Sequence, residues 1–333
     1  MTNRARALAA TLPALALALT ACGNEADAGS GTEDGTLSIV ASTNVYGDVA
    51  AAIAGDAAEV TSIITSAAQD PHEYEATTRD RLAVSEADVV IENGGGYDGF
   101  VDDLLTDAEP AAVLTAVDLS GLLEEDHDEQ DDEDHSDDDH SDDEHSDEEG
   151  HEGHDHVEGF NEHVWYDFHT MEALAEELAA ELSELDPDNA STYEDNLATF
   201  LEGVEALEES AEELRGRTDG LDAAITEPVP VYLLEEVGLT NVTPDDFSEA
   251  VEEGADVPPR VLQETLDVVT GSDLALLAYN EQTADSTTEQ VRAAAEEAGV
   301  PVVDFSETLP EGQDYLGWQQ ANLDAVAAAL GGA

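Results

Sequence analysis

Histidine is the residue whose number and placement in this sequence most directly suggest chemistry. Seven of the ten histidines lie between residues 124 and 156, and only His72, His163 and His169 lie elsewhere. Cys22 is the only cysteine, so the chain can form neither an internal disulfide nor a multi-thiolate metal site. Any metal must therefore be held by imidazole nitrogens and carboxylate oxygens.

Residues 124–156 form a low-complexity segment with 20 acidic residues and no apolar one, and a loose repeat, HSDDD-HSDDE-HSDEE, starts at His135. This composition cannot support a packed core and predicts a disordered loop. Imidazoles spaced along a carboxylate-rich chain can trap zinc-like ions weakly, and a charged spacer is the alternative. The predicted low-affinity ligands are His127, His135, His140, His145, His151, His154 and His156.

The charge balance of the chain is extreme, with 82 acidic residues, eight arginines, no lysine and a formal net charge of -74. Such a surface repels phosphate backbones, which excludes nucleic-acid binding. Most of the acidic residues lie outside the segment 124–156, so the excess is global. Adaptation to a salty habitat, where ions screen the repulsion, is favoured over attraction of cations as its main cause. The net charge does not identify a ligand.

The N-terminus has the pattern of an export signal. Arg4 and Arg6 precede the apolar stretch Leu8–Leu19, which is too short to span a bilayer as a mature helix. The following residues, LTACG, resemble the processing site of a bacterial lipoprotein, with Cys22 as the lipidated first residue. We therefore expect a signal peptide over 1–21, a tether over 22–35 and anchorage to the outer face of the cell membrane by this lipid only. A signal peptide cut nearby, with an incidental cysteine, is the alternative.

Short apolar runs alternate with helical patterns in two stretches of the chain, which predicts an α/β fold with parallel sheets covered by helices. In the first stretch the predicted strands are 37–42, 60–65, 88–92 and 112–117, with helices at 47–54 and 78–87. In the second, the predicted strands are 274–279 and 300–305, with helices at 259–270, 286–298 and 313–330.

A long amphipathic helix is predicted between these stretches, over residues 187–217, from apolar residues that recur every three or four positions. Its length favours a stiff strut between two lobes over an ordinary helix packed on a single domain. The expected organisation is a first lobe at 36–186, the linking helix at 187–217 and a second lobe at 218–333.

Two histidines outside the acidic segment have neighbours that suggest a binding site. His72 lies in DPHEYE after the second predicted strand, where a ligand-binding loop of an open α/β sheet is expected. His163 lies in NEHVWYD, just after the acidic segment and before a helix. An isolated histidine is more often structural than a ligand, so these positions alone leave both interpretations open.

The combination of DPHEYE, a His- and Asp-rich insertion and EHVWYD resembles the cluster A-I zinc- and manganese-binding proteins of ABC transporters. The similarity covers nearly all of the mature chain. It implies two α/β lobes with parallel sheets joined by one long rigid helix, and a metal site in the cleft between them. It also implies a monomer that delivers the metal to an ABC permease.

In that family one residue from each of four loops holds the metal. By motif, His72 and His163 are the two imidazole ligands from the first lobe. Glu227 stands where many zinc binders carry a third histidine, as in the manganese-type members. For the fourth ligand, usually an aspartate, Glu307 is the nearest match and Asp304 is the alternative.

Two imidazoles and two carboxylates suit zinc, manganese or iron(II). The general affinity order and the His-rich segment favour Zn²⁺ as the transported ligand, whereas Glu227 favours the alternative, Mn²⁺. Ligating imidazoles usually donate their second N–H to a carboxylate or carbonyl, and Glu73, Glu162 and Asp167 are the candidates.

The function expected from the resemblance is capture and delivery of a metal without chemistry, so no enzyme is expected. Four protein ligands leave little room for an activated water. One alternative is an extracellular metal buffer or adhesin without a transporter. Another is a mononuclear metallohydrolase, but the sequence contains neither HExxH nor GxSxG.

Overall fold

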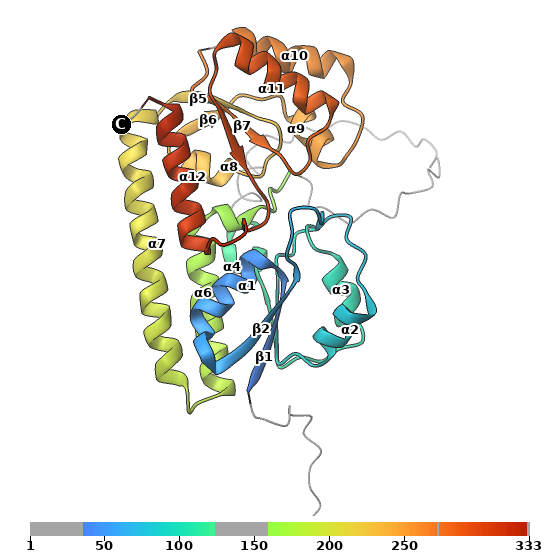
Figure 1. The fold of residues 1–333 in the computed structure, drawn as a ribbon, viewed down its shortest axis with the longest axis vertical. Helices are drawn as coiled ribbons and strands as arrows, with labels where there is room; N and C mark the ends of the chain where they lie inside the picture. The colour runs from blue at the N-terminus through green and yellow to red at the C-terminus, as the bar shows by residue number, and fades with distance from the viewer. Residues whose placement is uncertain (1–35, 124–158, 272, 332–333) are drawn as a thin grey trace, which may run out of the picture. The chain divides into compact units, whose positions relative to one another are not determined.

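The computed structural model describes residues 36–123, 159–271 and 273–331 (Figure 1). The predicted signal peptide, the tether with Cys22 and all seven histidines of the segment 124–156 lie outside the described residues.

The first sheet contains four parallel strands in the order β2-β1-β3-β4. Their bounds are Leu37–Thr43 for β1, Ala58–Ile64 for β2, Val89–Glu92 for β3 and Ala112–Thr115 for β4. In the central strand β1, Ile39 pairs with Val60 on one side and with Val89 on the other. Every residue of β3 is buried, as expected for an inner strand of a parallel sheet with helices on both faces.

The second sheet repeats this arrangement, with four parallel strands in the order β6-β5-β7-β8. They are β5 (Leu221–Ile225), β6 (Leu239–Asn241), β7 (Leu276–Asn280) and β8 (Val302–Phe305). The predicted fold class, two α/β lobes with parallel sheets, is confirmed. The sequence did not predict β5 and β6 as strands, because β6 has only three residues and β5 (LDAAI) is poor in residues that favour strands.

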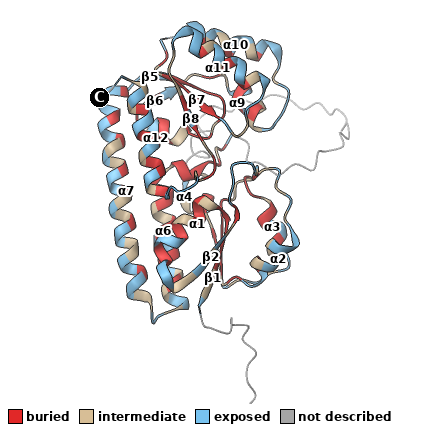
Figure 2. Cartoon of the chain, viewed as in Figure 1, coloured by how far each residue is buried: buried red, intermediate tan, exposed pale blue. Residues whose placement is uncertain are grey.

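Helices cover both faces of each sheet (Figures 1 and 2). The helices of the first lobe are α1 (Asn44–Ala54), α2 (Thr78–Ser85), α3 (Phe100–Leu105), α4 (Ala116–Ser120) and α6 (Phe168–Leu185). Those of the second lobe are α8 (Val231–Glu236), α9 (Asp245–Glu252), α10 (Pro259–Gly271), α11 (Ser286–Ala298) and α12 (Tyr315–Ala329). In the described part of the chain, none of the helices has the length and apolar character that crossing a membrane requires.

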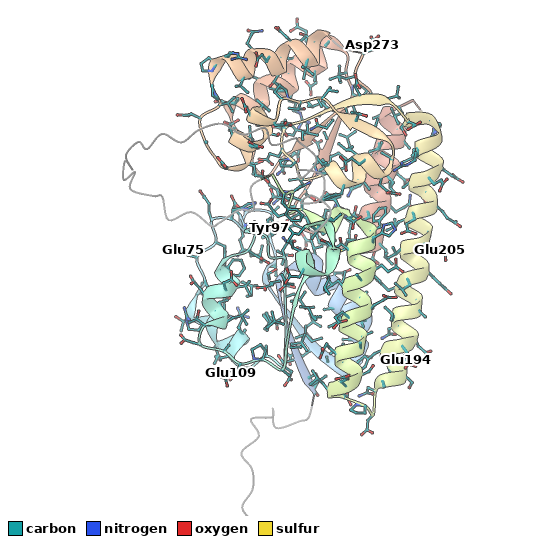
Figure 3. All side chains as sticks on the ribbon, turned by 180° about the vertical axis from the view of Figure 1, so that it is seen from behind. Glu75, Tyr97, Glu109, Glu194, Glu205 and Asp273 are labelled. Atoms are coloured by element: carbon teal, nitrogen blue, oxygen red, sulfur yellow. The ribbon has the colours of Figure 1, made fainter. Side chains whose placement is uncertain are left out.

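The longest helix, α7 (Ala190–Thr218), packs against α6 and α1 of the first lobe and against α12 and α8 of the second (Figure 1). One stripe of α7 is buried, from Tyr193 through Phe200 to Leu214. The opposite side carries exposed acids such as Glu194 and Glu205 (Figure 3). The apolar core that lines α7 continues into both lobes, so this one helix packs against both halves of the fold.

Direct hydrogen bonds also join the first lobe to the loop that follows β8. Asn44, the first residue of α1, donates from Nδ2 to the carbonyl of Leu309 (2.8 Å) and accepts from its backbone N–H (3.0 Å). The backbone N–H of Tyr315 donates to the carboxylate of Asp48 (2.7 Å). These bonds hold the carboxyl-terminal loop of the second sheet against α1.

Two glycines in α7 allow a test of how closely this helix packs on α12. A methyl group at Gly203 would overlap the side chain of Leu316, whereas nothing lies within 4 Å of a methyl group at Gly216. We expect Gly216→Ala to raise the free energy of unfolding by about 0.5–1 kcal/mol through helix propensity. Gly203→Ala should raise it less than Gly216→Ala or lower it, because Leu316 must move. Urea unfolding at fixed ionic strength measures both, and equal stabilisation by the two variants would contradict close packing of α7 on α12.

Candidate metal site

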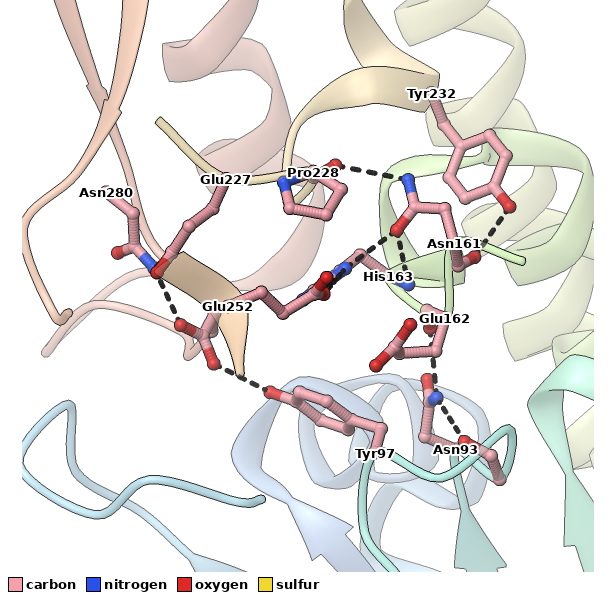
Figure 4. Close-up of polar contacts among 12 residues, drawn as sticks. Asn93, Tyr97, Asn161, Glu162, His163, Glu227, Pro228, Tyr232, Glu252 and Asn280 are labelled. Carbon is pink, nitrogen blue, oxygen red and sulfur yellow. Dashed lines mark hydrogen bonds and ion pairs between the residues drawn. The ribbon is translucent and has the colours of Figure 1, made fainter. Parts of the chain in front are cut away.

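Polar side chains follow the carboxyl ends of strands in both sheets, the position where ligands bind to open α/β sheets. His72 lies in the loop after β2, and Tyr97 lies in the loop after β3. In the second sheet, Glu227 follows β5 by two residues and Glu307 follows β8 by two residues. Hydrogen bonds between the two lobes bring the two sets together (Figure 4), so each lobe contributes to one polar site.

The first group in this site contains two imidazoles and one carboxylate. Ligand atoms of His72, His163 and Glu252 all lie within 4.8 Å of one another. The side chain of His163 is 1% exposed, and its Nδ1 lies 3.6 Å from Oε1 of Glu252. His72 and His163, the two predicted imidazole ligands, are therefore neighbours, with ring centroids 6.3 Å apart.

The second group is a pair of buried carboxylates, the predicted ligands Glu227 and Glu307. The side-chain amide of Asn280, at the end of β7, donates to both of them, at 2.7 Å in the case of Glu307. The hydroxyl of Tyr97 lies 3.5 Å from the other oxygen of Glu307. Burial raises the pKa of Glu227. Burial and the adjacent Glu227 raise the pKa of Glu307 to about 8.

The structure thus divides the four predicted ligands between two adjacent groups. His72 and His163 belong to the cluster of three, while Glu227 and Glu307 are held together by Asn280 and are not members of that cluster. Asp304, the alternative to Glu307, forms an ion pair with Arg292 at 2.9 Å and has a 44% exposed side chain. It lies with Arg292 at the surface rather than with the other carboxylates.

Glu252 is the group that sequence reasoning missed. It is the last residue of α9 and one of 82 acidic residues in the chain. No local pattern distinguishes it from Glu249 or Glu253 on the same turn, which are exposed. The only signal in the sequence is its position between the two stretches that were predicted to form α/β units. This signal is too weak to select one carboxylate.

Asn161 orients the imidazole of His163. Its Oδ1 lies 2.7 Å from Nδ1 of His163 and also accepts the backbone N–H of that residue, at 3.2 Å. Because an amide oxygen can only accept, Nδ1 carries the hydrogen and the Nε2 lone pair is left for a metal. Asn161 also donates to the carbonyl of Pro228 (3.1 Å) and accepts at its own carbonyl from Tyr232 (2.6 Å), which ties this loop to the second lobe (Figure 4).

The sequence had offered Glu73, Glu162 and Asp167 as partners of the ligating imidazoles. In the structure the amide of Asn161 is a partner of His163. Asp167 caps α6 by accepting the backbone N–H of Thr170 at 2.8 Å. His169 has a 72% exposed side chain and lies 3.8–3.9 Å from Glu208 and Asp167, so it stands apart from the site.

A buried network behind the site supports the loop that carries His163. The side chain of Asn93, which follows β3, donates to the carbonyl of Glu162 (2.9 Å) and accepts from the hydroxyl of Tyr46. The carboxylate of Asp98 accepts the backbone N–H groups of Asn93 (2.7 Å) and Gly94 (2.9 Å). These bonds connect the end of the first sheet to the residue adjacent to His163, and so restrict where the imidazole can move.

The chemistry of this donor set suits a divalent cation. Burying carboxylates without a compensating positive charge is unfavourable and raises their pKa values. Within the described residues, no arginine forms an ion pair with Glu227, Glu252 or Glu307. A metal ion bound by these oxygens and by the two imidazoles would supply the missing positive charge.

Comparisons with known proteins show the family to which the sequence is similar. Residues 39–329 match the family described as ZnuA, the periplasmic component A of a zinc-uptake complex. The zinc-binding lipoprotein AdcA of Streptococcus pneumoniae is 27% identical over 93% of this chain and 58% of its own length. The manganese-binding lipoprotein MntA of Halalkalibacterium halodurans is 30% identical over 59% of this chain and 55% of its own length. The chain thus spans little more than half the length of these two relatives.

Solved structures share the fold at lower sequence identity. The periplasmic zinc-binding protein TroA from Treponema pallidum superposes with a TM-score of 0.66 and 16% identity. The match covers 89% of this chain and 99% of TroA.

The raised pKa of Glu307 predicts how pH affects the metal-free protein. Between the unfolded value of about 4.3 and the folded value of about 8, the folded state binds more protons than the unfolded state. The free energy of unfolding should therefore fall as pH rises across this interval. Glu307→Gln should reduce this dependence, whereas Glu311→Gln, at an exposed position, should not. Unfolding at pH 5 and pH 8.5 in high salt with chelator measures this, and parallel profiles for all three proteins would contradict it.

Proposed function

Because the chain belongs to the ZnuA family, whose description is a periplasmic zinc-uptake component, we propose that it is the substrate-binding protein of an ABC importer. In this function it captures a divalent transition metal outside the cytoplasm and delivers the ion to a membrane permease. Zinc is the favoured cargo and manganese is the alternative.

The observation that supports this proposal is that candidate donors from both lobes lie in two adjacent groups, one with the two imidazoles and one with two buried carboxylates. His72 and His163 come from the first lobe, while Glu227 and Glu307 follow strands of the second. His163, Glu227 and Glu307 are each less than 5% exposed. A metal held between these residues would connect the two lobes directly. The arrangement of the lobes, and with it the surface of the protein, would then differ between the metal-bound and metal-free states.

The choice between zinc and manganese rests on opposing tendencies. Zinc binds more tightly than manganese to any given site of nitrogen and oxygen donors, and AdcA is named as a zinc-binding protein. Carboxylate-rich coordination suits the harder manganese ion, and MntA is named as a manganese-binding protein. Glu227 in place of a third imidazole is the feature of this chain that favours manganese.

The proposed role is binding without catalysis. Four protein ligands fill the coordination sphere of a tetrahedral zinc ion, whereas a hydrolytic zinc site keeps one position open for water. The site residues serve to hold the ion. Asn161 orients His163, Asn280 keeps Glu227 and Glu307 together, and the buried surroundings exclude competing water.

Two parts of the proposal rest on the sequence alone. Cys22 would carry the lipid that keeps the protein at the outer face of the membrane, and AdcA and MntA are named lipoproteins. The histidines between residues 124 and 156 would bind zinc-like ions weakly and raise their concentration near the tight site.

A competitive metal titration tests the proposed function. For the soluble form from Gly23 onward, stripped of metal, we expect one tight equivalent of zinc or manganese together with several weak ones. Glu227→Ala should abolish the tight equivalent, because it removes a charged ligand from a buried site, while Glu202→Ala, at an exposed position on α7, should retain it. Calorimetry and native mass spectrometry measure both, and a wild-type protein without a tight site would refute the proposal.

Deletion of residues 124–156 separates the two classes of site in the same titration. The tight equivalent should remain and only the weak ones should be lost. Loss of tight binding would contradict this division between the segment and the site.

Asn161 provides a test of how His163 is positioned. Asn161→Ala removes the acceptor of the Nδ1–H group and should weaken metal binding by about 10- to 100-fold, as is typical for groups that orient a ligand. Asn161→Asp keeps an acceptor for Nδ1 and should retain more of the affinity, although it loses the hydrogen bond to Pro228. Metal affinities at pH 8 measure this difference, and equal affinities for the two variants would contradict an orienting role.

A further inference from the structure

The carboxylate of Glu252 has no role in the four-ligand set inferred from the sequence. It extends from the end of α9 in the second lobe toward His163 of the first lobe (Figure 4). Glu252 is also the only carboxylate that shares a cluster of possible metal-ligand atoms with the two imidazoles in the described residues. The structure therefore brings a fifth candidate donor to the site.

One oxygen of Glu252 is buried without a hydrogen bond. Its Oε1 is shielded from solvent and accepts no hydrogen bond within the described residues. Leaving a buried acceptor unsatisfied costs about 1–3 kcal/mol for a neutral group and more for a charged one. Nδ1 of His163, at 3.6 Å, is too far to satisfy it and already donates to Asn161 at 2.7 Å.

The surroundings of Glu252 offer it other carboxylates rather than a positive group. Its charged neighbours include the carboxylates of Glu162, Glu227 and Glu307. The arginines whose ion pairs the structure describes bind acids elsewhere on the surface, such as Glu236, Glu264 and Asp304. A cation entering between the imidazoles and these carboxylates would relieve the unfavourable contacts of all of them at once.

The distances are compatible with direct coordination. A metal about 2.1 Å from each donor holds pairs of donors about 3–4 Å apart. The ligand atoms of His72, His163 and Glu252 already lie within 4.8 Å of one another. A shift of Glu252 Oε1 toward a metal breaks no hydrogen bond, because this oxygen accepts none within the described residues.

We propose that Glu252 is an additional, third carboxylate ligand of the metal. This ligand increases the number of oxygen donors in the site and reduces the ratio of zinc affinity to manganese affinity. This inference rests on the proposed function and specifies how the site selects its cargo. Zinc in protein sites is satisfied by four donors, whereas harder ions such as manganese accept more oxygen ligands. An extra carboxylate therefore benefits manganese more than zinc.

The test compares Glu252→Gln with Glu253→Gln, which removes a charge from the adjacent, exposed position. Zinc and manganese affinities are measured by competition at pH 8 for both variants and wild type. X-ray absorption of the manganese-loaded proteins counts the donors, and near-UV circular dichroism checks the fold. For Glu252→Gln we expect the manganese affinity to fall by about 10- to 100-fold, the zinc affinity to fall by a smaller factor, and one oxygen donor to be lost. Glu253→Gln should match wild type.

Three outcomes would overturn the role of Glu252. These are unchanged affinities in Glu252→Gln, an equal loss for both metals with an unchanged donor count, and the same loss in Glu253→Gln. The wild-type measurement keeps this result separate from the proposed function. Tight binding by wild type together with an unaffected Glu252→Gln would refute the inference alone, whereas wild type without a tight site would refute both.

Discussion

The interaction on which the site depends is the electrostatic repulsion among carboxylates that are largely removed from water. In addition to burial, Glu227 and Glu307 raise the pKa of Glu252, and Glu227 raises the pKa of Glu307. No arginine in the described residues pairs with any of these three carboxylates. An arrangement of this kind is unfavourable in the metal-free protein. In the proposed function a divalent cation would neutralise these carboxylates, and the relief of their repulsion would favour binding.

The scaffold holds these groups in place from two sides. In parallel sheets all strands present their carboxyl ends at one edge, and here the edges of both sheets supply site residues. The long helix α7 and the core continuous with it pack against both lobes. Hydrogen bonds from Asn44 to Leu309 and from Asn161 to Pro228 join the loops themselves. The donors are consequently fixed by backbone and packing rather than by contacts among the charged groups, which repel one another.

The large negative charge of the chain and the small number of buried carboxylates have different physical roles. Exposed acids such as Glu194 and Glu205 on α7 (Figure 3) remain hydrated, and salt screens their mutual repulsion. The site carboxylates are removed from water and from screening, so each unit of charge has a larger effect on binding. Total charge therefore gives little information about the metal, whereas in the proposed function the few site carboxylates would select it.

The sequence by itself determined the alternation of strands and helices, the long helix, and the local motifs around His72 and His163, because hydrophobic periodicity and short motifs act over a few residues. Glu227 and Glu307 came from the family resemblance, and only Glu307 follows a strand that the sequence predicted. Only the tertiary structure revealed the short strands β5 and β6, the support of His163 by Asn161, and the approach of Glu252. A three-residue strand exists because a neighbouring strand pairs with it, and Glu252 differs from Glu253 only in the direction in which the folded helix end points. Such distinctions arise from contacts between segments remote in sequence, which no local pattern records.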